Sequence, residues 1–117
     1  MPLKYINNVQ LTEISQKVLE AAKEVLGDKL IKVILYGSYA RGDYDNESDV
    51  DFFILAHIPQ EEAGLWRRNI RSRIPYLSLD YDLCVSLHVT GSTKFNEYAD
   101  TLPFYINVIK EGVLLDG

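Results

Sequence analysis

Two aspartates stand at the start of a strongly apolar segment, SDVDFFIL, where they are Asp49 and Asp51. If this segment is a β-strand, residues at that spacing point to the same face and lie about 6.5–7 Å apart along the backbone. Two short carboxylates there can converge on one divalent ion or on a close pair of ions. Mg²⁺ and Mn²⁺ favour such hard oxygen ligands, and without a cation the two charges repel each other. The alternative is that both aspartates only begin an exposed strand.

A glycine and a serine, Gly37 and Ser38, directly follow another apolar run, LIKVILY, and ten residues separate Ser38 from Asp49. A glycine permits close backbone approach, and the serine adds a hydroxyl and an amide, which are groups that hold a phosphate. Two other phosphate or metal motifs are excluded. A P-loop needs Lys where Asp43 stands, and an EF-hand starting at Asp43 needs Gly and Glu at positions 48 and 54, which are Ser and Ile.

The whole segment, YGSYARGDYDNESDVDFFIL, resembles the signature of the polymerase-beta-like nucleotidyltransferases, in which G-S is followed after ten residues by D-x-D. The A-R-G after the serine and the S-D before the first carboxylate agree with that signature. The short chain and its closing stretch, LPFYINVIKEGVLL, resemble the minimal nucleotidyltransferases that are paired with HEPN-domain ribonucleases in toxin–antitoxin modules. The resemblance covers nearly the whole chain.

The resemblance implies a role for each residue of the candidate site. Asp49 and Asp51 would hold two Mg²⁺ (or Mn²⁺) ions, and a third carboxylate on a neighbouring strand would complete the metal site. Asp82 is the preferred third ligand, because an apolar run follows it, and Asp80 is the alternative. The nucleotide-binding residues would be Gly37, Ser38 and Arg41. Gly37 and Ser38 would anchor the β- and γ-phosphates of ATP, and Arg41 would neutralise the leaving pyrophosphate.

Arg41 has a second interpretation, as a surface arginine paired with Asp43 or Asp45. Tyr36 and Tyr39 flank the glycine–serine turn, where either ring could stack on a base. Cys84, the single cysteine, is expected to be a buried and inert thiol.

The implied reaction is the transfer of AMP from ATP to a tyrosine hydroxyl of a HEPN toxin, which would make the chain a protein adenylyltransferase antitoxin. A 117-residue chain leaves little room for an acceptor-binding domain, so the acceptor pocket is expected to come from a second polypeptide. Two alternatives stay open. The chain could be a non-catalytic antitoxin that occludes its toxin, or it could modify a small-molecule hydroxyl in a pocket built by a homodimer.

The elements that must position these residues are readable from periodicity. Apolar residues at helical spacing predict a helix that ends before Gly27. These residues are Leu11, Ile14, Val18, Ala22 and Val25. Strands are predicted over 30–36, 48–56 and 79–89, a helix over 59–73, and a last helix between Pro103 and Gly112. We therefore expect one α/β (α+β) domain over residues 1–117, with a small mixed sheet of three or four strands flanked by helices. The resemblance implies that this domain has the polymerase-beta-like nucleotidyltransferase fold.

Composition restricts the partners. The net charge of -5 disfavours direct nucleic-acid binding, and the arginine-rich stretch over 66–73 is interpreted as the solvated face of its helix. The one cysteine excludes an internal disulfide framework. No apolar run reaches the roughly 18 residues of a membrane span, and the first ten residues contain no signal-peptide core. A soluble, cytoplasmic protein without membrane partners is expected.

Overall fold

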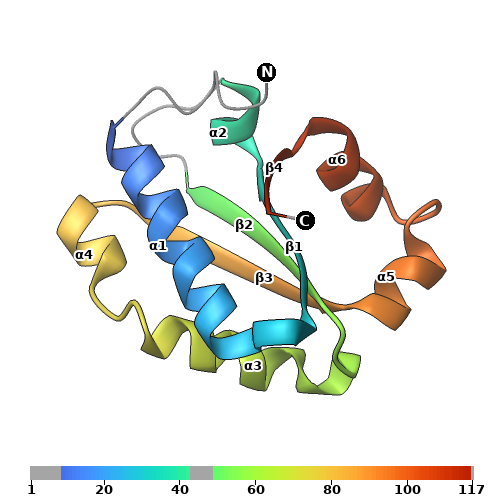
Figure 1. The fold of residues 1–117 in the computed structure, drawn as a ribbon. Helices are drawn as coiled ribbons and strands as arrows, with labels where there is room; N and C mark the ends of the chain where they lie inside the picture. Colours follow the sequence, from blue (N-terminus) through green and yellow to red (C-terminus); the bar gives the residue numbers. More distant parts are fainter. Residues whose placement is uncertain (1–8, 43–48, 117) are drawn as a thin grey trace.

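The computed structural model of the chain describes residues 9–42 and 49–116, and places a single four-stranded sheet between two groups of helices (Figure 1). The strand order is β3-β2-β1-β4, with β2 and β3 parallel and the other neighbours antiparallel. The elements are α1 (Val9–Leu26), η2 (Gly27–Lys29), β1 (Leu30–Tyr36), α2 (Ser38–Arg41), β2 (Val50–Ala56), η3 (Gln60–Glu62), α3 (Ala63–Ser72), α4 (Leu77–Tyr81), β3 (Val85–Gly91), α5 (Ser92–Tyr98), α6 (Pro103–Glu111) and β4 (Val113–Asp116). The expected mixed α/β fold class is confirmed.

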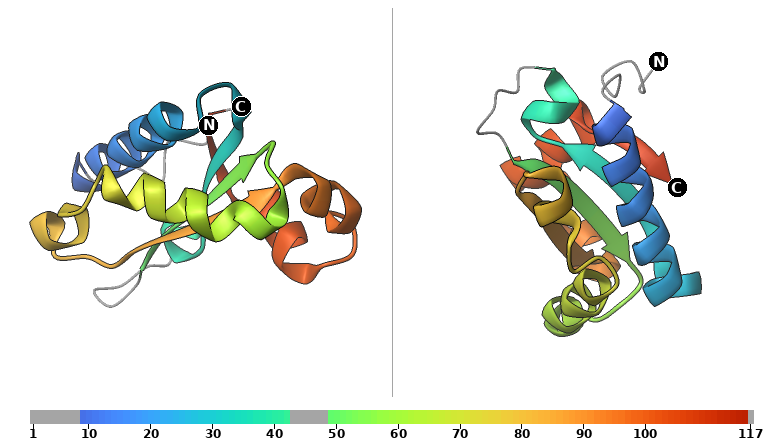
Figure 2. Two further views of the ribbon diagram at one scale, coloured as in Figure 1. Left: turned by 90° about the horizontal axis from the view of Figure 1, so that it is seen from below. Right: turned by 90° about the vertical axis from the view of Figure 1, so that its left-hand side faces the viewer.

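One face of the sheet is covered by α1, α3 and α4, and the other by α5 and α6 (Figure 2). The helix predicted before Gly27 is confirmed as α1, whose apolar side is buried at Leu11, Ile14 and Val18. Strand residues alternate between the two cores, so that Phe52 packs on the α1 side and Phe53 on the α6 side. Both phenylalanines are fully buried, which makes β2 the centre of the fold.

The core on the α6 side is built from aromatic rings. Phe53 lies 5.7 Å from Phe95, 6.0 Å from Phe104 and 6.0 Å from Tyr105, measured between ring centroids. Ring pairs at such separations contribute about 1 kcal/mol each beyond the area that they bury. This cluster fixes α6 beside the end of the sheet where Asp51 lies.

The prediction of a third strand over residues 79–89 is wrong for its first half. Residues 77–81 form α4, and the strand begins only at Val85. The physical reason is the length of its neighbour: β2 starts at Val50, opposite Val85, so residues before Val85 have no strand to pair with. They satisfy their backbone locally instead, with the amide of Asp80 donating to the carbonyl of Tyr76 at 2.8 Å.

The other predicted elements are confirmed with small changes of boundary. The helix predicted over 59–73 is divided into η3 and α3, and the last helix begins at Pro103 and has Gly112 at its C-cap. Helix α5 and the edge strand β4 had not been given residue ranges from the sequence pattern. None of the helices within residues 9–42 and 49–116 has the length and apolar composition of a membrane span.

Candidate functional site

The glycine–serine turn and the D-x-D carboxylates meet at one end of the sheet. Tyr36, the last residue of β1, is the antiparallel partner of Asp51 on β2, so Gly37 comes next to the Asp51 side chain. A Cβ atom on Gly37 would lie 2.5 Å from Asp51 Oδ2, a separation that real Cβ atoms do not show. Gly37 also has φ 78° and ψ -157°, a conformation that L side chains rarely adopt. Glycine is therefore required here for two independent reasons.

The turn continues directly into the short helix α2. The carbonyl oxygen of Gly37 accepts hydrogen bonds from the amides of Ala40 and Arg41, each at 3.1 Å. Ser38 is half-buried, whereas Tyr39 is only 5% exposed and belongs to the core on the α1 side. Tyr39 is thus not available to stack on a base, and that expectation is wrong.

The anionic form of Asp51 is unfavourable in its surroundings, and a bound cation would stabilise it. Asp51 is half-buried and Asp49 is exposed. Burial, followed by the charge of Asp49, raises the pKa of Asp51 above its ordinary value of 3.8, while Arg41 acts in the opposite direction. Paired carboxylates against a glycine cradle are a hard-oxygen donor set, which fits Mg²⁺ or Mn²⁺.

This shift predicts a pH dependence of stability. Because the raised pKa means that the folded protein holds the Asp51 proton more tightly than the unfolded chain, stability from this group falls as pH rises from 3.8 through the folded pKa. We expect the wild type to lose stability relative to Asp51→Asn as pH rises from about 4 to about 7 in EDTA. Urea unfolding at each pH measures the difference. A difference that moves in the opposite direction would show that Asp51 is stabilised as its anion.

Arg41 lies at the surface beside the carboxylates. Its Nη1 is 3.6 Å from Glu111 Oε1 on α6, with both side chains more than 40% exposed. An exposed ion pair contributes only about 0–1 kcal/mol, so exchanging Glu111 for a phosphate costs little. The alternative partners of Arg41, Asp43 and Asp45, lie outside the described residues.

Tyr36 borders the site on the α6 side. Its ring makes an edge contact with Phe104, at 5.5 Å between centroids. Burial, with a smaller contribution from Asp51, raises the pKa of Tyr36 to about 12. The hydroxyl therefore keeps its proton at neutral pH and is available as a hydrogen-bond donor.

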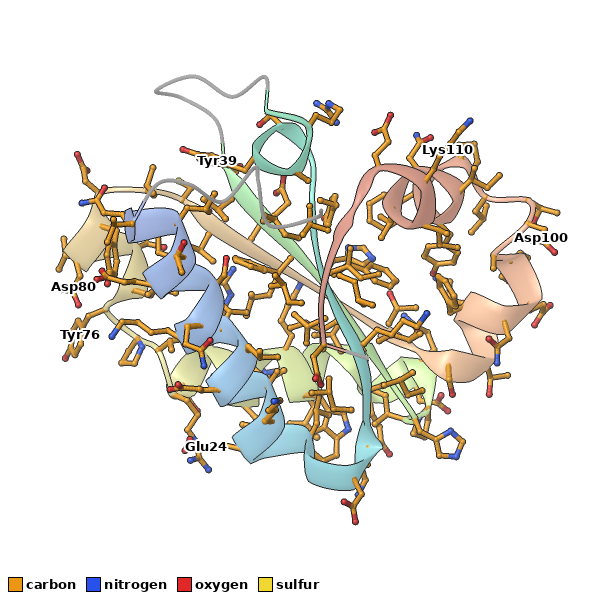
Figure 3. The ribbon with its side chains drawn as sticks, turned by 45° about the horizontal axis from the view of Figure 1, so that its top comes forward. Glu24, Tyr39, Tyr76, Asp80, Asp100 and Lys110 are labelled. Carbon is orange, nitrogen blue, oxygen red and sulfur yellow. The ribbon has the colours of Figure 1, made fainter. Side chains whose placement is uncertain are left out.

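The two candidates for a third carboxylate are not on β3, where the sequence analysis expected them. Asp80 belongs to α4 and lines a groove with Lys17 and Glu24 of α1, on the sheet face opposite Asp51; Figure 3 shows it across the molecule from Lys110 of α6. Asp82 is the exposed C-cap of α4, with φ 53°. Among residues 9–42 and 49–116, no three His, Cys, Asp or Glu side chains lie close enough together to hold a metal ion.

Two further residues, Ser86 and His88, lie on the same face of the sheet as the site, although neither was predicted to be a site residue. Ser86 is the registered neighbour of Asp51 on β3, and the His88 ring stacks on Phe53 at 5.9 Å. Alternation along the third strand predicts that Ser86 and His88 share a face, but their places opposite Asp51 and Phe53 follow only from the strand register. Cys84, expected to be buried, is exposed; it directly precedes β3, and its carbonyl accepts a hydrogen bond from the Val50 amide at 2.9 Å.

The sequence matches the nucleotidyltransferase domain family over residues 15–115, a span that includes the turn, the carboxylates, strands β1 to β3 and most of β4. The chain belongs to this family. This minimal nucleotidyltransferase is also similar to two Methanocaldococcus jannaschii proteins whose names propose protein adenylyltransferase activity. One is 38% identical over 98 residues, covering 83% of this chain and 96% of the relative. The other is 30% identical over 100 residues, covering 86% of this chain and 92% of the relative.

Membership makes this chain a nucleotidyltransferase enzyme, which acts on a nucleotide substrate. The contact between Gly37 and Asp51 explains why the family signature joins two segments so far apart in sequence. One supplies a turn without side-chain bulk, and the other supplies the carboxylate that occupies the space.

Proposed function

We propose that this nucleotidyltransferase transfers AMP from ATP to a tyrosine hydroxyl of a partner protein, and that the partner is a HEPN-domain toxin that the modification silences. The observation that carries the proposal is the close approach of the Gly37 turn to Asp51, since it places a turn suited to a phosphate beside paired carboxylates. The M. jannaschii relatives, named for activity on proteins, support a protein acceptor. The resemblance to minimal nucleotidyltransferases supports the HEPN toxin.

The reaction exchanges one phosphoester bond for another. The phenolic oxygen of the acceptor attacks the α-phosphorus of ATP, the bond from that phosphorus to the bridging oxygen of the β-phosphate breaks, and pyrophosphate leaves with the bonding electrons. The phenolic proton passes to solvent. Divalent Mg²⁺, when bound, supplies charge neutralisation to the phosphates and lowers the pKa of the attacking hydroxyl.

The residues of this chain hold and orient the reactants. Asp49 and Asp51 would hold Mg²⁺, because the charge of Asp49 acts on the half-buried Asp51 carboxylate and a cation would bind both. The Gly37 backbone and the Ser38 hydroxyl would anchor the β- and γ-phosphates. Arg41 would leave Glu111 to bind the pyrophosphate. Asp82 as a further ligand stays a prediction.

Arg41→Ala is expected to lower the rate of AMP transfer about 100-fold, because a preorganised cation at the leaving group stabilises charge that develops in the transition state. Initial rates at saturating ATP measure the effect. Arg73→Ala is the matched control, since Arg73 pairs with Glu24 at 3.1 Å on a distant surface and its loss should leave the rate unchanged. Equal rates for both variants would remove Arg41 from the proposed mechanism.

The proposal is tested with ATP labelled at the α-phosphate, Mg²⁺, and the product of the adjacent gene, which we expect to be the HEPN partner. Label should appear on a tyrosine of the partner, whereas ATP labelled at the γ-phosphate should leave the partner unlabelled. Absence of label on the partner after incubation with the α-labelled ATP would overturn the proposal. Toxin neutralisation that persists without ATP would instead favour an antitoxin that acts by occlusion.

A further inference from the structure

Two aromatic side chains are exposed on the face of the sheet that carries Asp51. Phe104 of α6 is 36% exposed, although Phe53 and Tyr105, whose rings it contacts, are almost fully buried. His88 of β3 is exposed as well. The ring centroids of Phe104 and His88 are 4.7 Å apart, with an angle of 52° between the ring planes. These two residues are called the aromatic shelf below.

The aromatic shelf adjoins Asp51 through printed strand and ring neighbours. Tyr36 is the antiparallel partner of Asp51, and its ring makes the edge contact with Phe104 at 5.5 Å. His88 is registered with Phe53, and Phe53 is the next residue after Asp51 on the same face of β2. Because residues two apart on a strand are separated by about 6.5–7 Å, the aromatic shelf begins one same-face position beyond the carboxylate.

The order of the strands indicates what the aromatic shelf would bind. The Gly37 turn follows β1, Asp51 lies on β2 and His88 lies on β3, and these three strands are adjacent in that order. With the β- and γ-phosphates at the turn and the α-phosphate at the carboxylates, as proposed above, the nucleoside lies on the β3 side of Asp51. The aromatic shelf occupies that side.

Helix α6 indicates the same direction. Its last residue, Glu111, pairs with Arg41, the proposed ligand of the pyrophosphate, whereas Phe104 near its start contacts His88. Glu111 and Phe104 are about 10 Å apart along the helix axis. One helix therefore borders the proposed phosphate end of the site and, at its other end, supplies a ring of the aromatic shelf.

The chemistry of the two rings suits a flat, uncharged ligand. Nucleobases stack on aromatic side chains, and every base has a face that can do so. Partial desolvation, followed by the charges of Lys94 and Arg67, lowers the pKa of His88 below its ordinary value of 6.5. The His88 ring is thus uncharged at neutral pH, and a base can cover it without desolvating a charge.

We propose that the aromatic shelf, Phe104 with His88, binds the base of the nucleotide substrate and so holds the α-phosphorus at the carboxylates. The inference rests on the proposed function, from which it takes the positions of the phosphates. Phe104 and His88 are substrate-binding residues in this account. Because stacking is open to every base, the aromatic shelf favours a nucleoside triphosphate over bare triphosphate and does not select among bases.

Binding of α,β-methylene ATP with Mg²⁺, measured by isothermal titration calorimetry, tests the inference without AMP transfer, because the carbon bridge of this analogue is not cleaved. Phe104→Leu keeps an apolar side chain in the cluster but removes the ring, and it should weaken binding about 10-fold. His88→Ala, at an exposed position, should weaken binding at least about 3-fold. Inorganic tripolyphosphate has no base, and its affinity should be unchanged in both variants.

Phe95→Leu is the matched control, since it makes the same substitution in the same cluster. The Phe95 ring lies 5.7 Å from Phe53, but it lines a groove with Lys32 and Leu55, further from Asp51 along the strands. This variant should bind the analogue and tripolyphosphate like the wild type. If Phe104→Leu does not fold, His88→Ala and Phe95→Leu still decide.

Three results would overturn the inference: equal losses in Phe104→Leu and Phe95→Leu, equal losses for the analogue and tripolyphosphate, or unchanged affinity for the analogue in Phe104→Leu and His88→Ala. In the last case, a higher KM for the partner protein would assign the aromatic shelf to the acceptor instead. Failure of the proposed function gives a different result, because a wild type that binds the analogue through these rings but labels no partner would contradict the transferase and leave the base site intact.

Discussion

Asp51→Asn is expected to reduce AMP transfer by about a thousand-fold or more while leaving the protein folded. The amide keeps the shape of the carboxylate beside Gly37 but removes the charge that we propose holds the divalent ion, and charge stabilisation by such ions contributes several kcal/mol to the transition state. Asp49→Asn should behave similarly. The rate of labelled AMP transfer at saturating ATP and Mg²⁺ measures the effect.

Stability should respond in the opposite direction from activity. Burial and Asp49 raise the pKa of Asp51, so its anion is unfavourable in the metal-free protein, and Asp51→Asn should not lower the free energy of unfolding at neutral pH. Asp100→Asn, in the exposed turn before α6, is a control that should change neither property. A transfer rate within about 10-fold of wild type in both Asp51→Asn and Asp49→Asn would show that the pair is not the metal-binding centre.

Gly37→Ala should lower the free energy of unfolding by about 3 kcal/mol and also abolish measurable transfer. The alanine must adopt φ 78° and ψ -157°, and its Cβ would lie 2.5 Å from Asp51 Oδ2, so backbone strain and overpacking add. Urea unfolding with EDTA present measures the stability term, and transfer at a temperature where the variant is folded measures the activity term.

Two controls separate the causes of that loss. Gly27→Ala adopts a left-handed φ of 53° with no atom within 4 Å of its Cβ, so it should cost only about 1 kcal/mol and leave transfer intact. The double variant Gly37→Ala with Asp51→Ala removes the collision. Its loss of unfolding free energy should therefore be smaller than the sum of the losses in the two single variants, while activity stays absent. Equal costs for Gly27→Ala and Gly37→Ala would show that contact with Asp51 has no energetic consequence.

The parts of the site that could be predicted from the sequence are those fixed by local pattern. β1 and β2 are short runs of apolar, largely β-branched and aromatic residues, and each lies next to the polar signature that it positions. The alternation of Asp49 and Asp51 with buried Val50 set their common face without knowledge of any other strand. Gly37 was identified as a close-approach position, and the structure adds which atom approaches it.

The placement of Asp82, the candidate third carboxylate, could not be predicted, because it depends on how long the neighbouring strand β2 is. The segment over 77–83, LSLDYDL, alternates like a strand, yet it also places Leu77 and Tyr81 one helical turn apart. Where β2 has no residues to pair with, the helical hydrogen bonds prevail and Asp82 becomes a left-handed cap. The proximity of Ser86 to Asp51 likewise follows from strand register, which couples residues 35 positions apart.

The most direct test of the central claim is intact-mass analysis of the proposed HEPN partner after incubation with this chain, ATP and Mg²⁺. The partner should gain the mass of one or more adenylyl groups, fragmentation should locate them on tyrosine, and Asp51→Asn should leave the partner mass unchanged. A partner of unchanged mass whose ribonuclease activity is suppressed equally by the wild type and by Asp51→Asn would contradict an adenylyltransferase built on this carboxylate pair.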